Sequence, residues 1–196
     1  MKISTTRLSP SKVHTKEERA VRRRAAYSFL LSEIKSIYGD ITSEGSEGEA
    51  SDPDIFPFRK DPLGKPYLEG YPQILFNLSH SRNGYAAAVV EDAGQALSVG
   101  IDIEFRFPYN ELLARKICHV CEAEALQYAC SEEERKDLLN FFWSRKEALL
   151  KCEGTGIRSS LKSLDTVHID KRRYEIFEKQ TDEYTLVVCK KRISLR

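Results

Sequence analysis

Two long helical segments, each opened by the same capping signal and each followed by strand-like segments, constrain the fold of this 196-residue chain. In the first, Thr15 stands three residues before Glu18, and apolar residues then recur at the spacing of one helix face. In the second, Ser131 and Glu134 repeat this signal ahead of another long helix. Because both halves show the same order, we predict an α+β protein of two similar lobes with a cleft between them.

The remaining predicted elements and the domain boundary follow from the same pattern. Strands are predicted at 73–78, 84–90 and 97–104, and after the second long helix at 166–169, 173–178 and 184–189. Shorter helices are predicted at about 110–117 and 122–129. We place the amino-terminal lobe at residues 1–95 and the carboxy-terminal lobe at residues 96–196. Residues 43–54 are rich in Gly, Ser and acids and are expected to form a flexible loop, and residues 64–68 a turn.

Charge and cysteine content exclude several classes of protein. Thirty-one basic residues oppose thirty acidic residues, so the net charge of +1 provides no general attraction to nucleic acid or to a membrane surface. The longest apolar run, from Tyr85 to Val90, is far too short to span a bilayer, and a cytoplasmic protein is expected. The five cysteines form no disulfide pattern, and Cys118 and Cys121 make a C-x-x-C without the second pair of ligands that a zinc site needs.

The segment GIDIE at 100–104 carries two carboxylates on a predicted strand. Asp102 and Glu104 are two residues apart, so both side chains leave the same face, with Cα atoms about 7 Å apart. Carboxylates with no soft ligand nearby suit Mg²⁺, which completes its shell with water and phosphate oxygens. The alternative is an edge strand with one solvated face.

The segment WSRKEALLKCEGTG at 143–156 places Trp143, Glu147 and Lys151 on one face of the second long helix. Taken alone, Glu147 and Lys151 could form an ordinary surface salt bridge. A functional site instead requires Glu147 to meet Asp102 and Glu104 around one metal, with Lys151 facing a phosphate.

The segment FNLSHS at 76–81 ends a predicted strand with a polar turn that contains Ser79 and His80. No nucleophile elbow is present, so a serine hydrolase is disfavoured. These side chains could bind an anion such as phosphate, or could simply form a hydrogen-bonded turn. The basic residues between Lys12 and Arg24 are expected mainly on a solvated helix face, with one or two available to an anion.

Taken together, FNLSHS, GIDIE and WSRKEALLKCEGTG resemble, in order and spacing, the signature of 4′-phosphopantetheinyl transferases of the surfactin type, and GKPYL at 64–68 matches a further motif of that family. The resemblance covers about residues 64–157, whereas the amino-terminal region matches poorly. It implies a pseudo-twofold cytoplasmic monomer that transfers the phosphopantetheine arm of coenzyme A to a serine of an acyl or peptidyl carrier protein. The reaction releases 3′,5′-ADP and depends on Mg²⁺.

The resemblance also implies roles for individual acids and for one lysine. Asp102, Glu104 and Glu147 match the metal-binding carboxylates, and Lys151 matches the lysine that assists the leaving phosphate. Glu122 falls where the family often has a further acid near the site. Whether Glu122 or Glu147 acts as the general base stays open at this point.

The same resemblance assigns contacts with the phosphates of coenzyme A to Lys65, Ser79 and His80, beside Lys151. Two other functions remain possible from the residues alone. A metal-dependent phosphohydrolase could use the same carboxylates with water as nucleophile. A non-catalytic module could bind coenzyme A or a carrier protein, although such a module has no need for three acids and a lysine together.

Overall fold

The computed structural model describes residues 1–8, 15–41, 58–81, 83–156 and 160–193. The predicted acidic loop at 43–54 and the basic residue Lys12 lie outside these described residues. The strands are β1 (Lys2–Arg7), β2 (Phe58–Lys60), β3 (Pro66–Leu68), β4 (Ile74–His80), β5 (Tyr85–Asp92), β6 (Ser98–Phe105), β7 (Tyr174–Gln180) and β8 (Tyr184–Lys191). The helices are α1 (Lys16–Tyr38), α2 (Glu111–Ile117), α3 (Val120–Tyr128) and α4 (Glu132–Glu153), with a 3₁₀ turn η1 (Leu161–Ser163).

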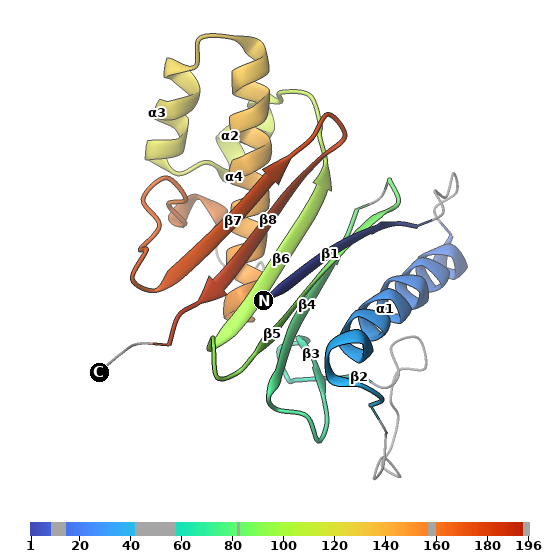
Figure 1. The fold of residues 1–196 in the computed structure, drawn as a ribbon. Helices are drawn as coiled ribbons and strands as arrows, with labels where there is room; N and C mark the ends of the chain where they lie inside the picture. Colours follow the sequence, from blue (N-terminus) through green and yellow to red (C-terminus); the bar gives the residue numbers. More distant parts are fainter. Residues whose placement is uncertain (9–14, 42–57, 82, 157–159, 194–196) are drawn as a thin grey trace.

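Two antiparallel three-stranded sheets with the same topology form the centre of the molecule (Figure 1). One has the strand order β1-β5-β4 and the other β6-β8-β7. In each, a first strand is followed by a long helix and then by a hairpin whose second strand lies in the middle of the sheet. The predicted α+β class is therefore confirmed. A two-stranded hairpin, β2-β3, is inserted in the first half, and α2 and α3 in the second.

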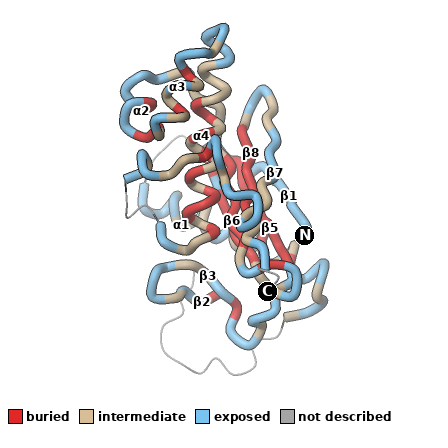
Figure 2. The backbone as a smooth tube through the Cα atoms, turned by 90° about the vertical axis from the view of Figure 1, so that its left-hand side faces the viewer, coloured by how far each residue is buried: buried red, intermediate tan, exposed pale blue. Residues whose placement is uncertain are grey.

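The alternation of side chains along the strands divides the core. On β5, Val90 packs with Leu30 of α1, whereas Val89 faces Ile101 of β6 and Val188 of β8. On β8, Val187, which immediately precedes Val188, packs against α4 instead. The side chains of successive strand residues point to opposite faces, so each sheet contacts a helix on one face and the other sheet on the opposite face. Figure 2 shows buried residues along the strands and along the side of α4 that faces them.

The two capping predictions are confirmed. Thr15 accepts a hydrogen bond from the Glu18 amide at 3.2 Å and begins α1. Ser131 accepts one from the Glu134 amide at 3.1 Å and begins α4. Helix α4 ends at Gly154, whose left-handed conformation has a φ of 70°. This conformation is unfavourable for residues with a Cβ, so the glycine ends the helix.

The structure differs from the local predictions at several places. No strand was predicted at β1, because its sequence KISTTR lacks an apolar face; it forms through backbone pairing with β5. Residues 166–169 are not a strand, because the Asp165 carboxylate accepts the amides of Val167 and His168 and turns the chain. Residues 66–68, predicted within a turn, form β3.

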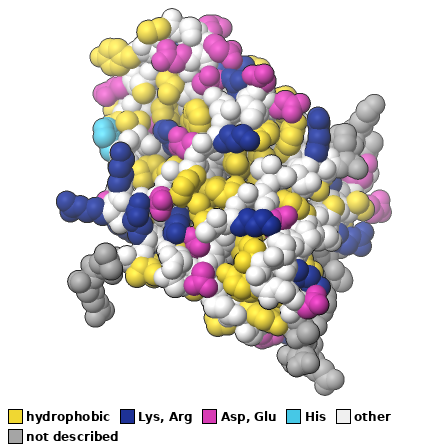
Figure 3. All heavy atoms as spheres, in the orientation of Figure 1, with side chains coloured by type: hydrophobic (Ala, Val, Ile, Leu, Met, Phe, Trp, Pro, Cys, Tyr) yellow, Lys and Arg dark blue, Asp and Glu magenta, His cyan; other side chains and the backbone are white. Residues whose placement is uncertain are grey.

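The distribution of charge on the surface agrees with the nearly equal numbers of acidic and basic residues. On the face shown in Figure 3, acidic and basic side chains are interspersed and do not gather into a field of one sign. Within the described parts of the chain, every helix is too short or too polar to cross a membrane.

Strand β6 lies directly against the backbone of α4 at Gly100. A Cβ at this position would overlap the Ala148 carbonyl and the Cys152 amide. The glycine therefore permits an approach that no larger residue allows. Since Gly100 and Asp102 share one face of β6, this approach also brings the Asp102 carboxylate to α4.

We expect the substitution Gly100→Ala to destabilise the protein by about 1–3 kcal/mol, because the added methyl group overpacks the interface with backbone atoms that cannot move aside. Urea denaturation would show a lower midpoint with an unchanged slope. The matched control is Gly94→Ala, where the added Cβ would meet only the Asp92 side chain. Equal midpoints for the two variants would contradict this account of the packing.

Candidate functional site

Three side chains from β4, β6 and α4 form a closed hydrogen-bonded triangle. The Lys151 ammonium donates to Asp102 Oδ1 at 2.7 Å and to Ser79 Oγ at 2.9 Å. Ser79 Oγ in turn donates to Asp102 Oδ1 at 3.1 Å. Lys151 thus pairs with a carboxylate of β6, and the interpretation of this lysine as one half of an exposed salt bridge on its own helix is wrong.

Two carboxylate oxygens beside this triangle are buried and lack a hydrogen-bond partner among the described residues: Asp102 Oδ2 and Glu147 Oε1. Burial raises the pKa of Glu147, and the negative charge of Asp102 adds to this effect, while Lys151 opposes it. A buried anionic oxygen without a partner is costly unless a cation is available. The donor set therefore fits a hard divalent cation such as Mg²⁺.

Glu104 lies on the same face of β6 as Asp102, as predicted, and is half-buried. One of its oxygens accepts the amide of the next residue, Phe105, at 2.9 Å. The role of Glu104 in metal binding stays a prediction.

His80 and Lys65 occupy different positions relative to the triangle. His80 lies at the end of β4, where desolvation and the positive charges of Lys151 and Arg22 lower the pKa of its imidazole. Helix α1 therefore contributes a cation near this histidine, from the basic segment in which the sequence pattern predicts one or two residues available to an anion. The Lys65 ammonium donates to the carbonyls of Val99 and Cys152 at 3.3 and 3.2 Å, at the carboxy-terminal end of α4. Burial lowers the pKa of Lys65.

Glu122 is engaged away from the triangle. It is 0% exposed, forms an ion pair with Lys146 at 2.9 Å and accepts the amides of Thr166 and His119 at 3.0 and 2.8 Å. The bond from His119 belongs to a capping box that begins α3. These contacts account for a structural role of this acid.

Lys146 was not identified from the sequence. It is also 0% exposed, and its ammonium donates to the carbonyls of Leu161 and Leu164. Its position four residues after Phe142 and three before Leu149, both buried, indicates a place on the apolar face of α4. A lysine on that face requires partners that only the folded chain reveals.

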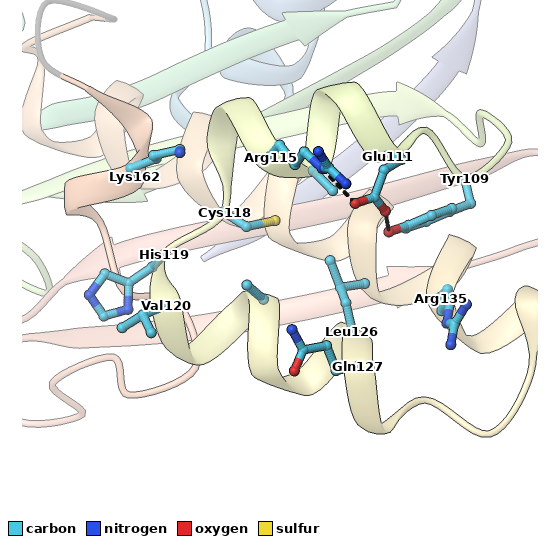
Figure 4. A pocket seen from close by; sticks show the side chains of 12 residues that line it. Tyr109, Glu111, Arg115, Cys118, His119, Val120, Leu126, Gln127, Arg135 and Lys162 are labelled. Atoms are coloured by element: carbon cyan, nitrogen blue, oxygen red, sulfur yellow. Dashed lines mark hydrogen bonds and ion pairs between the residues drawn. The ribbon is translucent and has the colours of Figure 1, made fainter.

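A hollow of about 890 Å³ lies between α2 and α3 (Figure 4). Its lining includes Tyr109, Arg115 and Lys162, but none of the predicted site residues. The sequence predicted the two short helices, but it gave no indication of this hollow, because the hollow depends on how the helices pack.

Comparison with known proteins finds a family that is similar to the carboxy-terminal part of the molecule. Residues 98–192 match the model of the 4′-phosphopantetheinyl transferase superfamily. This part of the chain is therefore similar to that superfamily. The resemblance found in the motifs is thereby confirmed, and Asp102, Glu147 and Lys151 all lie within the matched residues.

Individual members of the superfamily align over a larger part of the chain. A 4′-phosphopantetheinyl transferase of Bacillus subtilis is 30% identical over 131 residues, which are 66% of this chain and 56% of the relative. One of Bacillus pumilus is 31% identical over 151 residues, 75% of this chain and 60% of the relative. An L-aminoadipate-semialdehyde dehydrogenase-phosphopantetheinyl transferase of Eremothecium gossypii is 28% identical over 165 residues, which are 80% of this chain and 56% of the relative. The chain therefore spans less than two thirds of the length of each of these phosphopantetheinyl transferases.

We expect Glu147→Gln to raise the melting temperature of the metal-free protein at pH 7. The folded state raises the pKa of Glu147, so ionisation costs stability once the pH exceeds the pKa of the unfolded chain, about 4.3. The amide removes that cost. The gain should shrink as the pH falls toward about 4, where the native carboxyl group becomes neutral.

Melting curves in a chelator between pH 4 and pH 8 measure this difference. Glu124→Gln, at an exposed position on α3, is the control and should change the melting temperature little. A melting temperature for Glu147→Gln that is below that of the wild type at pH 7 would show that the Glu147 charge is well compensated.

Proposed function

We propose that this protein transfers the 4′-phosphopantetheine arm of coenzyme A to a serine hydroxyl of an apo acyl or peptidyl carrier protein, releasing 3′,5′-ADP. The observation that carries the proposal is the pair of buried oxygens Asp102 Oδ2 and Glu147 Oε1, which have no hydrogen-bond partner in the described part of the chain and lie beside the Lys151 ammonium. These two oxygens form a site that fits a divalent cation, and the Lys151 ammonium adds a second positive charge beside it. The match of residues 98–192 to the 4′-phosphopantetheinyl transferase superfamily supports the proposal.

Transfer of this arm breaks a phosphoanhydride bond, so negative charge grows on the bridging oxygen of the leaving group. Mg²⁺ would be held by Asp102 and Glu147, with Glu104 as the third ligand, and would supply positive charge across the pyrophosphate. Lys151 stabilises the departing phosphate by charge and hydrogen bonding. Because its ammonium already contacts both Ser79 and Asp102, it is positioned before substrate binds.

Binding of the coenzyme A phosphates is assigned to Ser79, His80 and Lys65. Ser79 presents a hydroxyl beside Lys151. The His80 imidazole can donate a hydrogen bond to a phosphate oxygen in its neutral as well as its charged form. Lys65 would have to exchange one of its two backbone carbonyl contacts for a phosphate oxygen.

We assign the general base to Glu147. The attacking serine must lose a proton as it adds to phosphorus, and a carboxylate beside the metal can accept that proton directly or through water. Glu122 could act only by giving up its ion pair with Lys146 and its two backbone contacts. Removing those interactions from a buried carboxylate is costly.

The proposal also covers the arrangement of the two lobes, the oligomeric state of the protein and its location in the cell. The shared topology of the two sheets supports a pseudo-twofold relation between lobes at residues 1–95 and 96–196. Ser79 comes from the first lobe and Asp102 and Lys151 from the second, which supports a site at their junction. We propose that the enzyme acts as a cytoplasmic monomer.

Intact-mass measurement of an apo carrier protein tests the function. Incubation with this protein, coenzyme A and Mg²⁺ should add one phosphopantetheine to the carrier, and a chelator should abolish the addition. Glu147→Gln should lose transfer, whereas the folded fraction of Glu122→Gln should retain it.

Other results would assign a different function. Release of phosphopantetheine from coenzyme A without a carrier would indicate a phosphohydrolase. An unmodified carrier that nevertheless binds would indicate a non-catalytic module. Loss of transfer in Glu122→Gln, with Glu147→Gln active, would reverse the assignment of the base.

We expect Lys151→Ala to lower kcat about 10²-fold to 10³-fold, because its charge acts on the phosphate that departs in the transition state. Lys151→Arg should recover only part of kcat, since the guanidinium keeps the charge but changes the geometry. Steady-state transfer assays at saturating Mg²⁺ measure both values.

The matched control is Lys191→Ala. Lys191 is also half-buried and forms an ion pair, with Glu153 at 3.0 Å, so this variant loses a similar interaction outside the proposed site. It should keep kcat near the wild-type value. If Lys151→Ala and Lys191→Ala had the same kcat, Lys151 would have no role in the chemical step.

A further inference from the structure

A second group of metal-ligating side chains lies outside the site described above. One ligand atom each of His119, Cys121 and Asp165 can be chosen so that all lie within 4.8 Å of one another. His119 caps the amino-terminal end of α3, Cys121 lies in its first turn, and Asp165 follows η1. All three are partly exposed, so an ion could reach them from solvent. In Figure 4 the His119 ring points away from the Cys118 sulfur, so this group does not include that neighbouring thiol.

The Asp165 carboxylate is held in a fixed orientation. Its Oδ1 accepts the amides of Val167 and His168 at 2.9 and 3.2 Å. Its Oδ2 faces two imidazole nitrogens, Nδ1 of His168 at 2.9 Å and Nδ1 of His119 at 3.8 Å. Backbone hydrogen bonds to one oxygen of a carboxylate orient the other, as partners of metal ligands commonly do.

The contact between His119 and Asp165 lacks a proton. Nδ1 of His119 accepts the Cys121 amide at 3.3 Å, so this nitrogen carries a lone pair and not a hydrogen. A nitrogen lone pair and a carboxylate oxygen therefore face each other. Two acceptors in this position are stabilised by a cation between them.

We propose that His119, Cys121 and Asp165 bind Zn²⁺, with His168 as the fourth ligand. Imidazole, thiolate and carboxylate are the ligands that Zn²⁺ takes in proteins, and the thiolate excludes Mg²⁺ as the preferred ion. Tetrahedral ligands at Zn–N, Zn–O and Zn–S distances of about 2.0–2.3 Å lie about 3.3–3.6 Å from one another. Among His119, Cys121 and Asp165, the separations of 3.8 Å and up to 4.8 Å require only small side-chain movements, whereas the exposed His168 side chain lies outside this group and would have to move further.

Zn²⁺ would bind the lone pair of His119 Nδ1, which now accepts the long hydrogen bond from the Cys121 amide. The other half of the capping box, from the His119 amide to Glu122 at 2.8 Å, would remain. The ion would thus tie α3 to the segment after η1, next to Thr166, which also bonds to Glu122. Since Glu122 pairs with Lys146 on α4, zinc would stabilise the structure that supports Glu147.

Competition with a chromophoric chelator measures the affinity for Zn²⁺, with excess Mg²⁺ present to occupy the carboxylate site. We expect one equivalent of Zn²⁺ to bind and to raise the melting temperature. Cys121→Ser and Asp165→Asn should each weaken binding at least about 100-fold. The Co²⁺-loaded protein should show a thiolate-to-cobalt charge-transfer band that Cys121→Ser abolishes. The control Cys130→Ser, at an exposed cysteine elsewhere, should change neither result.

Alkylation of the unmodified protein gives an independent test if Cys121→Ser fails to fold. Zn²⁺ should protect Cys121, but not Cys130, from iodoacetamide, as mass spectrometry of peptides would show. Absence of stoichiometric Zn²⁺ binding, or equal affinity in Cys121→Ser and Cys130→Ser, would overturn the proposal. Because none of these measurements depends on transfer activity, their failure is distinct from failure of the proposed function.

Discussion

The close approach of β6 to α4 is the contact on which the candidate site depends. Gly100 removes the side chain that would hold the strand away from the helix, and Asp102 follows on the same face. At that distance the Lys151 ammonium reaches Asp102 and Ser79 together. A larger residue at position 100 would separate the carboxylate from the lysine, and the buried Asp102 would then lose its charged partner.

A second buried ion pair stabilises the opposite side of α4. Lys146 and Glu122 are both fully buried, and every partner of Lys146 lies in α3 or in the segment around η1. Buried charges are tolerated only when they are paired and hydrogen-bonded, so this pair favours one arrangement of those segments. Since Lys146 precedes Glu147 in α4, the same arrangement orients the proposed base. The two ion pairs thus fix consecutive parts of one helix from two sides.

Local sequence signals predicted the elements that depend on local interactions. The capping residues Thr15 and Ser131 begin helices because their hydroxyls satisfy amides within the same turn. Strand β1 was missed because its pairing with β5 involves residues 78 to 88 positions away, which leave no pattern in KISTTR. The prediction of a strand at 166–169 was wrong because of a local contact. The Asp165 side chain accepts backbone amides of this segment and so competes with strand formation.

The sequence by itself determined which side chains share a face: Asp102 with Glu104 on β6, and Glu147 with Lys151 on α4. It did so because the periods of strands and helices are fixed by backbone geometry. Only the tertiary structure decided which partners those faces meet. Lys151 pairs with Asp102 and not with Glu147, and Glu122 pairs with Lys146. The physical reason is that burial removes water as an alternative partner, so each charge pairs with whichever group the packing of distant segments brings within reach.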